Sequence, residues 1–110
     1  MYHLVWISKY RKRVLTGLLA VRLKKLFEQS ASVHKWEVSE LSIQPDHVHM
    51  LVQLRPDVSI SMAMQLLKGG NSKVIRSEFP DLEEFLWGAR FWSDAYFAET
   101  IGVVNEAKFP

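Results

Sequence analysis

Two histidines, His47 and His49, are separated by one residue and have the type and spacing of a metal-binding pair. On a strand, alternate side chains share a face, so both imidazoles project from the same side, about 6.6 Å apart. Both rings can then lean toward one divalent ion at bonding distances of about 2.1 Å. Asp46 precedes the pair and can orient one imidazole through a hydrogen bond. The alternative is a solvated histidine pair without a ligand, and spacing alone leaves it open.

The composition restricts the chemistry further. The 110 residues include no cysteine, which excludes a disulfide scaffold, a thiolate zinc site, an iron–sulfur cluster and a cysteine nucleophile. A hydrophobic fraction of 48% and a charged fraction of 24% are typical of one globular domain. No apolar run approaches the length of a membrane span and no secretory leader is visible, so we expect a cytoplasmic protein. A chain this short buries only about two-thirds of its unfolded surface, which favours an oligomer.

Positive charge is concentrated near the N-terminus. Residues 1–35 contain eight basic side chains and one acidic, whereas residues 77–110 contain two basic and seven acidic. The densest basic cluster consists of Lys9, Tyr10, Arg11, Lys12 and Arg13. Its cations can neutralise phosphates and its tyrosine can stack on a base, which makes it a candidate DNA contact. A solvated charged loop is the alternative.

The elements that must position these residues follow the order β-α-β-β-α-β. Residue patterns predict strands over 2–8, 36–43, 47–54 and 91–101, and helices over 18–34 and 59–79. Ser59 is the expected N-cap of the second helix, and Gly69-Gly70 are expected to interrupt it. A further helical turn is expected over 103–108. This order predicts an α+β, ferredoxin-like fold: an antiparallel sheet with two helices on one face.

The remaining histidines and aromatic residues have structural explanations. We expect His3 to pack in the first strand and His34 to lie at the C-terminus of the first helix, where a positive charge is favourable. Trp87, Phe91 and Trp92 could stack on bases, but a place in the core is the expectation for them.

Five segments together resemble a known family. They are Tyr2-His3-Leu4-Val5-Trp6, Lys9-Tyr10-Arg11 with Val14-Leu15, Pro45-Asp46-His47-Val48-His49-Met50-Leu51, Leu67-Lys68-Gly69 with Ser72-Lys73, and Leu86-Trp87 followed by Trp92 to Gly102. In this order, over nearly the whole chain, they resemble the TnpA-type single-tyrosine HUH transposases of the smallest bacterial and archaeal insertion sequences.

The resemblance implies a transposase that binds DNA hairpins at insertion-sequence ends and cleaves and rejoins single-stranded DNA. It implies that His47 and His49 are ligands of a divalent metal, Mg or Mn, that stabilises charge on the scissile phosphate. A tyrosine would form a 5′-phosphotyrosine, so no nucleotide cofactor is needed. The family works as a homodimer with composite sites. The implied DNA-binding residues are Lys9, Tyr10, Arg11, Lys12, Arg13, Lys68, Lys73 and Arg76.

One family feature has no counterpart in the 110 residues. The nucleophilic tyrosine and a metal-binding glutamine belong to a helix beyond the position that matches Gly102. Residues 1–110 are therefore expected to form a single HUH domain without its tyrosine helix and to be catalytically defective. Tyr96 is a fallback nucleophile and Gln53 a fallback third ligand.

Two other functions remain open. The chain could be a non-catalytic DNA-hairpin-binding remnant of a transposase, or a dominant-negative dimer partner. It could also be a ferredoxin-like domain in which the histidine pair is accidental, with neither metal nor DNA binding.

Overall fold

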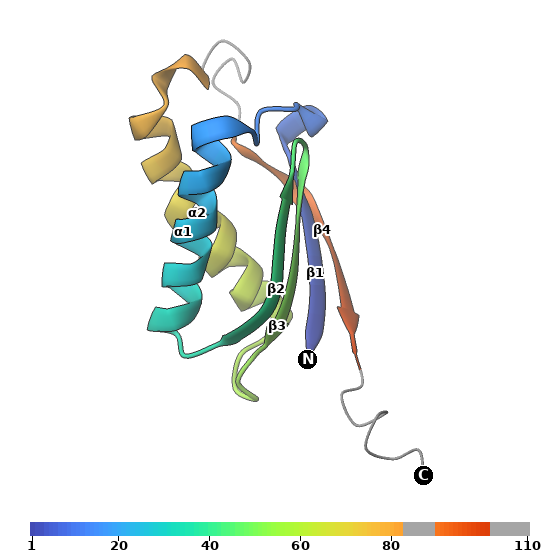
Figure 1. Cartoon of the computed structure of the whole chain (residues 1–110). Coiled ribbons are helices and arrows are strands. Elements are labelled where there is room, and N and C mark those ends of the chain that lie inside the picture. The colour runs from blue at the N-terminus through green and yellow to red at the C-terminus, as the bar shows by residue number, and fades with distance from the viewer. Residues whose placement is uncertain (83–89, 102–110) are drawn as a thin grey trace.

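The computed structural model describes residues 1–82 and 90–101, and these form a four-stranded antiparallel sheet with two helices on one face (Figure 1). The order of strands in the sheet is β2-β3-β1-β4. The strands are β1 (Tyr2–Ser8), β2 (Glu37–Gln44), β3 (His47–Gln53) and β4 (Trp92–Thr100); the helices are α1 (Gly17–Val33) and α2 (Ile60–Glu78), with short 3-10 turns η1 (Lys9–Arg11) and η2 (Pro80–Leu82). The predicted ferredoxin-like order is confirmed.

Alternation along the two central strands separates the core from the open face of the sheet. In β1 and β3 every second side chain is buried beneath the helices, and the antiparallel register aligns them, with Leu4 opposite Met50 and Trp6 opposite Val48. The intervening side chains point away from the helices. Both described helices lie on the same side of the sheet, so this second face is not covered by either of them (Figure 1).

Each helix packs on the sheet through an apolar stripe. In α1 the buried positions recur every four residues, from Leu19 to Ala31, as a 3.6-residue period requires. At the start of α2, Ser59 caps the helix by accepting a hydrogen bond from the backbone N–H of Met62 at 3.0 Å. At its other end, Arg22 donates to both carboxylate oxygens of Glu78, at 2.8 and 2.9 Å, which joins the helices.

The expected interruption of α2 at Gly69-Gly70 is wrong, because the helix is continuous from Ile60 to Glu78. The buried residues Leu67 and Ile75 flank the glycines and pack into the core on either side. This packing outweighs a propensity cost of about 1 kcal/mol per glycine, since tertiary contacts routinely override intrinsic preference.

Aromatic residues connect β4 with the core. Trp92 packs against the rings of Trp6, Phe27 and Phe91, and its indole N–H donates to Oδ1 of Asn71 at 3.2 Å. The core position expected for Phe91 and Trp92 is confirmed. Trp87, the segment Leu86-Trp87, Gly102 and the helical turn expected over 103–108 lie outside the described residues. Among the helices that are described, none is both long and apolar enough to span a membrane.

Candidate metal centre and DNA-binding surfaces

The histidine pair lies on the open face of the sheet. In β3, His47 and His49 are partly exposed, while Val48 and Met50 between and beside them are completely buried. The two imidazole centroids are 5.0 Å apart. The predicted shared face is therefore confirmed, and its origin is the two-residue period of a strand whose other side is the core.

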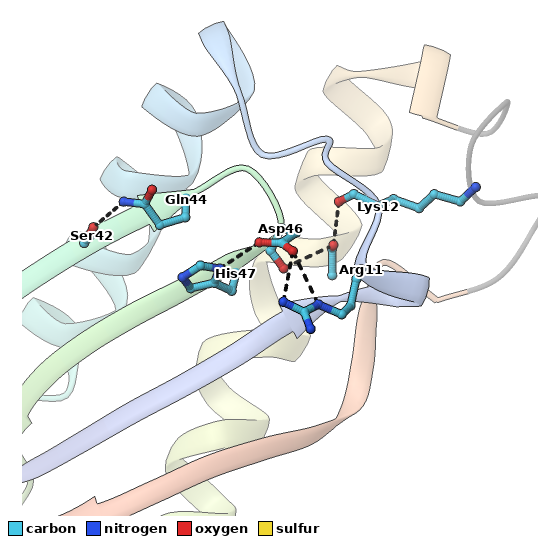
Figure 2. Close-up of polar contacts among 7 residues, drawn as sticks. Arg11, Lys12, Ser42, Gln44, Asp46 and His47 are labelled. Atoms are coloured by element: carbon cyan, nitrogen blue, oxygen red, sulfur yellow. Dashed lines mark hydrogen bonds and ion pairs between the residues drawn. The ribbon is translucent and has the colours of Figure 1, made fainter.

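The ring of His47 is oriented by Asp46. Nδ1 of His47 donates to Oδ1 of Asp46 at 2.7 Å, while the guanidinium of Arg11 contacts Oδ2 of the same carboxylate at 3.3 Å (Figure 2). The hydrogen bond from His47, and next the positive charge of Arg11, hold the pKa of Asp46 below its ordinary value. The carboxylate therefore remains an acceptor, and Nε2 of His47 is left for a ligand bond.

The ring of His49 has a different partner, which the sequence did not indicate. Nδ1 of His49 lies 3.0 Å from Nε2 of His3, a side chain 46 residues earlier in the chain. Burial, and then the neighbouring His47 and His3, lower the pKa of His49, so the ring favours its neutral, metal-binding form. His3 was expected only to pack in its strand. The antiparallel pairing of β1 with β3 brings it to the site, and no local pattern reports that register.

The donor set fits a divalent ion bound at an incomplete protein site. Both Nδ1 atoms of the histidine pair are engaged, which leaves two Nε2 atoms on one face. Within residues 1–82 and 90–101, no group of three His, Cys, Asp or Glu side chains is arranged to hold a metal. Gln53, the fallback third ligand, lies four residues beyond His49 at about 13 Å along the strand, and its amide donates to the backbone carbonyl of Leu54 at 3.4 Å. The structure does not bring it to the histidines.

Tyr96 lies on the opposite side of the sheet from the histidines. In the β1–β4 pairing it is opposite Trp6, whose side chain is buried beneath the helices, and Nζ of Lys68 on α2 is 5.9 Å from the centre of its ring. Within one chain the sheet therefore separates the ring of Tyr96 from His47 and His49, an arrangement that does not favour its fallback role as nucleophile.

The basic loop after β1 is attached to the turn that precedes the histidines. The backbone N–H of Ser8 donates to the carbonyl of Asp46 at 3.1 Å, and that of Leu15 donates to the carbonyl of Pro45 at 2.9 Å. Tyr10 and Arg11 both adopt positive φ, 58° and 52°, which turns the loop sharply and leaves Tyr10 68% exposed. Arg11, Lys12 and Arg13 are exposed as well. The loop thus presents cations and an aromatic ring beside the histidine site.

A second basic surface is a groove of about 630 Å³ between α2 and β4. Its lining includes Lys68, Gly69, Arg76, Arg90 and Tyr96. The ammonium of Lys68 donates to the carbonyl of Ser93 at 2.6 Å, and burial lowers its pKa. We will call this surface the α2/β4 groove.

Lys73 does not line the α2/β4 groove, whereas Lys68 and Arg76, the other two DNA-binding residues expected on this helix, do. Lys68, Ser72 and Arg76 recur every four residues and share one face of α2, whereas Lys73 follows Ser72 by one residue, about 100° around the helix. The basic loop also has no residue in common with the lining of this groove, so the expected DNA-binding residues form two surfaces.

Comparison with known proteins gives consistent matches. Residues 1–109 match the family described as "Transposase IS200 like". The ISDra2 transposase TnpA of Deinococcus radiodurans is 36% identical over 107 residues, which are 97% of this chain and 76% of that protein. The transposase of insertion sequence IS200 from Salmonella typhimurium is 30% identical over 97% of this chain and 70% of its own length.

Two solved structures share the fold. A Deinococcus radiodurans R1 protein assigned as a transposase superposes with a TM-score of 0.84 at 33% identity, over 97% of this chain and 82% of that one. A tyrosine transposase solved with a REP hairpin superposes with a TM-score of 0.65 at 14% identity, over 97% of this chain and 59% of that one. The second likeness concerns the fold alone.

Proposed function

Because the chain belongs to the IS200-like transposase family, we propose that it binds single-stranded DNA with a hairpin at the end of an insertion sequence. We further propose that residues 1–110 form one HUH domain in which His47 and His49 hold a divalent metal, Mg or Mn. The observation that carries this proposal is the pair of imidazoles on the open sheet face, each with Nδ1 engaged and Nε2 available.

The chain's own residues would prepare the scissile phosphate for attack. The metal, when bound, supplies a positive charge that stabilises the developing negative charge on phosphorus oxygens. Asp46 and His3 hold the two imidazoles in place. The basic loop, Lys9 to Arg13, neutralises flanking phosphates and offers Tyr10 for stacking on a base, while Arg11 connects this loop to Asp46.

The α2/β4 groove supports a second DNA contact. Lys68 and Arg76 give it positive charge, and the exposed ring of Tyr96 gives it a stacking surface. Such a combination of cations and aromatic rings is typical of single-stranded DNA binding. We assign Lys73, also exposed on α2, a peripheral phosphate contact at most. The hairpin in the structural relative is in accord with a hairpin substrate for this chain.

The nucleophile would come from outside the described residues. Tyr2 and Tyr96 are paired with Val52 and Trp6 and so belong to the helix-covered side of the sheet, while Tyr10 lies in the basic loop. We therefore propose that this 110-residue polypeptide binds metal and DNA without forming a phosphotyrosine by itself, and that a composite site requires a tyrosine helix, as in the family. The places of these three tyrosines also favour the alternative function, which is a non-catalytic hairpin-binding remnant or a dominant-negative dimer partner.

A homodimer is part of the proposal. Strand β4 is an edge of the sheet, and its exposed rings include Tyr96 (42%) and Phe97 (48%), one on each face. Edge strands with unpaired backbone groups pair readily with a second copy. Analytical ultracentrifugation tests this proposal, and the expected result is the mass of a dimer.

The central experiment measures binding and cleavage of single-stranded oligonucleotides that tile the DNA flanking the coding sequence. We expect one hairpin-forming oligonucleotide to bind with steep salt dependence, and its double-stranded form to bind weakly.

Isothermal titration with Mn²⁺ should give a site that His49→Ala removes and His34→Ala retains, since the ring of His34 bonds to the carbonyl of Ser30 and stacks on Trp36 at the end of α1. Absence of both DNA and Mn²⁺ binding would support the accidental-pair interpretation. A covalent adduct on the 110-residue chain would contradict its catalytic defect.

A further inference from the structure

We propose that His3 is a positioning residue of the metal site: it accepts a hydrogen bond from Nδ1–H of His49 and thereby fixes the tautomer in which Nε2 of His49 has a free lone pair. This inference rests on the proposed function, because a fixed tautomer of His49 has a role only if a metal binds at its Nε2. Its physical content, the protonation pattern of two touching rings, can be tested without a metal.

Strand register brings the two rings together. β1 and β3 are neighbours in the centre of the sheet, with Val5 opposite His49 and Leu51 opposite His3, so the histidines are diagonal neighbours on the open face. Their ring centroids are 5.1 Å apart with an interplanar angle of 33°, and the nitrogens are 3.0 Å apart. Such a distance requires one proton between the two nitrogens.

That proton can belong to either ring, and only one choice leaves a metal ligand. If Nε2 of His3 is the donor, neutral His49 has its own proton on Nε2 and cannot coordinate through it. If Nδ1 of His49 is the donor, its Nε2 is unprotonated and His3 has its proton on Nδ1. Since ligating imidazoles commonly donate their other N–H to an acceptor, the second pattern is the one a metal site needs.

The tautomers of the two proposed ligands are therefore fixed by different kinds of hydrogen-bond partner. His47 donates to the carboxylate of Asp46, which can only accept while it is ionised and so specifies the Nδ1–H tautomer of His47. His3 can accept or donate, and its surroundings on the open face come from β4: the ring of Phe97 lies 6.3 Å from it, and Glu99 is its partner in the strand pairing.

Long-range ¹H–¹⁵N correlation spectra of the metal-free wild-type protein test the tautomer directly. The expected pattern is Nδ1–H for His49 and for His3, with Nε2 of both unprotonated. Observation of Nε2–H on His49 would overturn the proposal, whatever the variants below do. His34 is the internal reference, because its Nδ1 bonds to the backbone carbonyl of Ser30 at 2.8 Å.

Two substitutions separate positioning from packing. His3→Gln retains a carbonyl acceptor near the position of Nε2, whereas His3→Phe retains an aromatic ring without an acceptor. We expect His3→Phe to weaken Mn²⁺ binding by about 10- to 100-fold, measured by isothermal titration, and His3→Gln to remain close to wild type. His3→Phe should also give His49 a mixture of tautomers in the ¹⁵N spectrum.

The outcomes distinguish this inference from the proposed function. Equal Mn²⁺ affinity of wild type and a folded His3→Phe variant would overturn the positioning role. Wild-type protein that binds no Mn²⁺ would instead contradict the metal site, while the ¹⁵N spectrum would still report whether His3 accepts from His49. Circular dichroism establishes the folded state of each variant.

Discussion

Asp46 accepts a hydrogen bond from Nδ1 of His47 at 2.7 Å with one carboxylate oxygen, and its other oxygen contacts Arg11 at 3.3 Å. One carboxylate thus joins the basic loop to the histidine site (Figure 2). Because Arg11 is one of the proposed phosphate contacts, movement of the loop on DNA binding would change the support of a proposed metal ligand.

Replacement of Asp46 by alanine should weaken Mn²⁺ binding by about 10- to 100-fold, since His47 then loses the acceptor that fixes its ring. Isothermal titration measures the effect. Asp46→Asn keeps one oxygen acceptor and should give a smaller loss. Asp57→Ala is the matched control, because this exposed aspartate interacts with Arg55 beyond the end of β3. Equal losses at both positions would mean that Asp46 acts only through net charge.

Lys68 and Lys73 lie on the same helix, and only Lys68 lines the α2/β4 groove. Lys68→Gln should weaken binding of the hairpin oligonucleotide and reduce the slope of log K against log salt by about one. Lys73→Gln should change the slope less. Fluorescence anisotropy over a salt series measures both. A larger effect at Lys73 would place the DNA on a different face of α2.

Gly69 and Gly70 provide a second matched pair. Both lie inside a continuous helix, and a methyl group at either position would meet no atom within 4 Å beyond the neighbouring residues and the adjacent turns of the helix backbone. Alanine at either site should therefore stabilise the fold by about 0.5–1 kcal/mol in chemical denaturation. Only Gly69 lines the groove, so only Gly69→Ala should also weaken DNA binding. Unchanged DNA binding in Gly69→Ala would show that the backbone there does not approach the DNA closely.

Asn71 should be important for stability. Its buried amide accepts the indole N–H of Trp92 and donates to the carbonyl of Leu67, which joins α2 to β4. Asn71→Ala leaves the indole unpaired and should cost about 1–3 kcal/mol of unfolding free energy. The same substitution in a Trp92→Phe background should cost less, because the donor is absent. Additive losses in this double-mutant cycle would contradict the coupling.

The ion pair between Arg22 and Glu78 predicts a pH dependence of stability. The hydrogen bond from Arg22, followed by its charge, holds the pKa of Glu78 below its ordinary value in the folded protein. A carboxylate with a depressed pKa contributes stability that is full above its unfolded pKa and is lost as the pH falls through the folded pKa. The stability difference between wild type and Glu78→Gln should thus be constant near neutrality and vanish in acid. Glu28→Gln, on the exposed face of α1, is the control in thermal melts.

Features that depend on local periodicity were predictable from the sequence. The alternation around Val48 and Met50 requires His47 and His49 to share a face. The cap at Ser59 involves only its own side chain and a backbone N–H in the first turn of α2, so it is also a local feature. The contact of His3 with His49 was not predictable, because it depends on the register of strands far apart in sequence. Likewise, a local propensity scale cannot report the packing of Leu67 and Ile75 that keeps α2 continuous.

The position of the cations on α2 could have been read from the sequence more closely. Lys68, Ser72 and Arg76 have the i, i+4 spacing of one helical face, and Lys73 breaks it. The face of Tyr96 could also have been read from the sequence, because it follows Trp92, a residue expected in the core, by four residues. Both residues belong to the helix-covered side of β4, although the β1–β4 pairing shifts register between Trp6 and Ser8.

The two faces of strand β3 limit the sequence changes that this protein can tolerate. Its seven residues serve the core with one set of side chains and the histidine site with the other. Insertion or deletion of a single residue within it would turn the histidines toward the helices and expose the valines, so the fold and the proposed metal site would be lost in the same step. Variation that preserves both is therefore confined in this strand to substitution, while changes of length must accumulate in the loops.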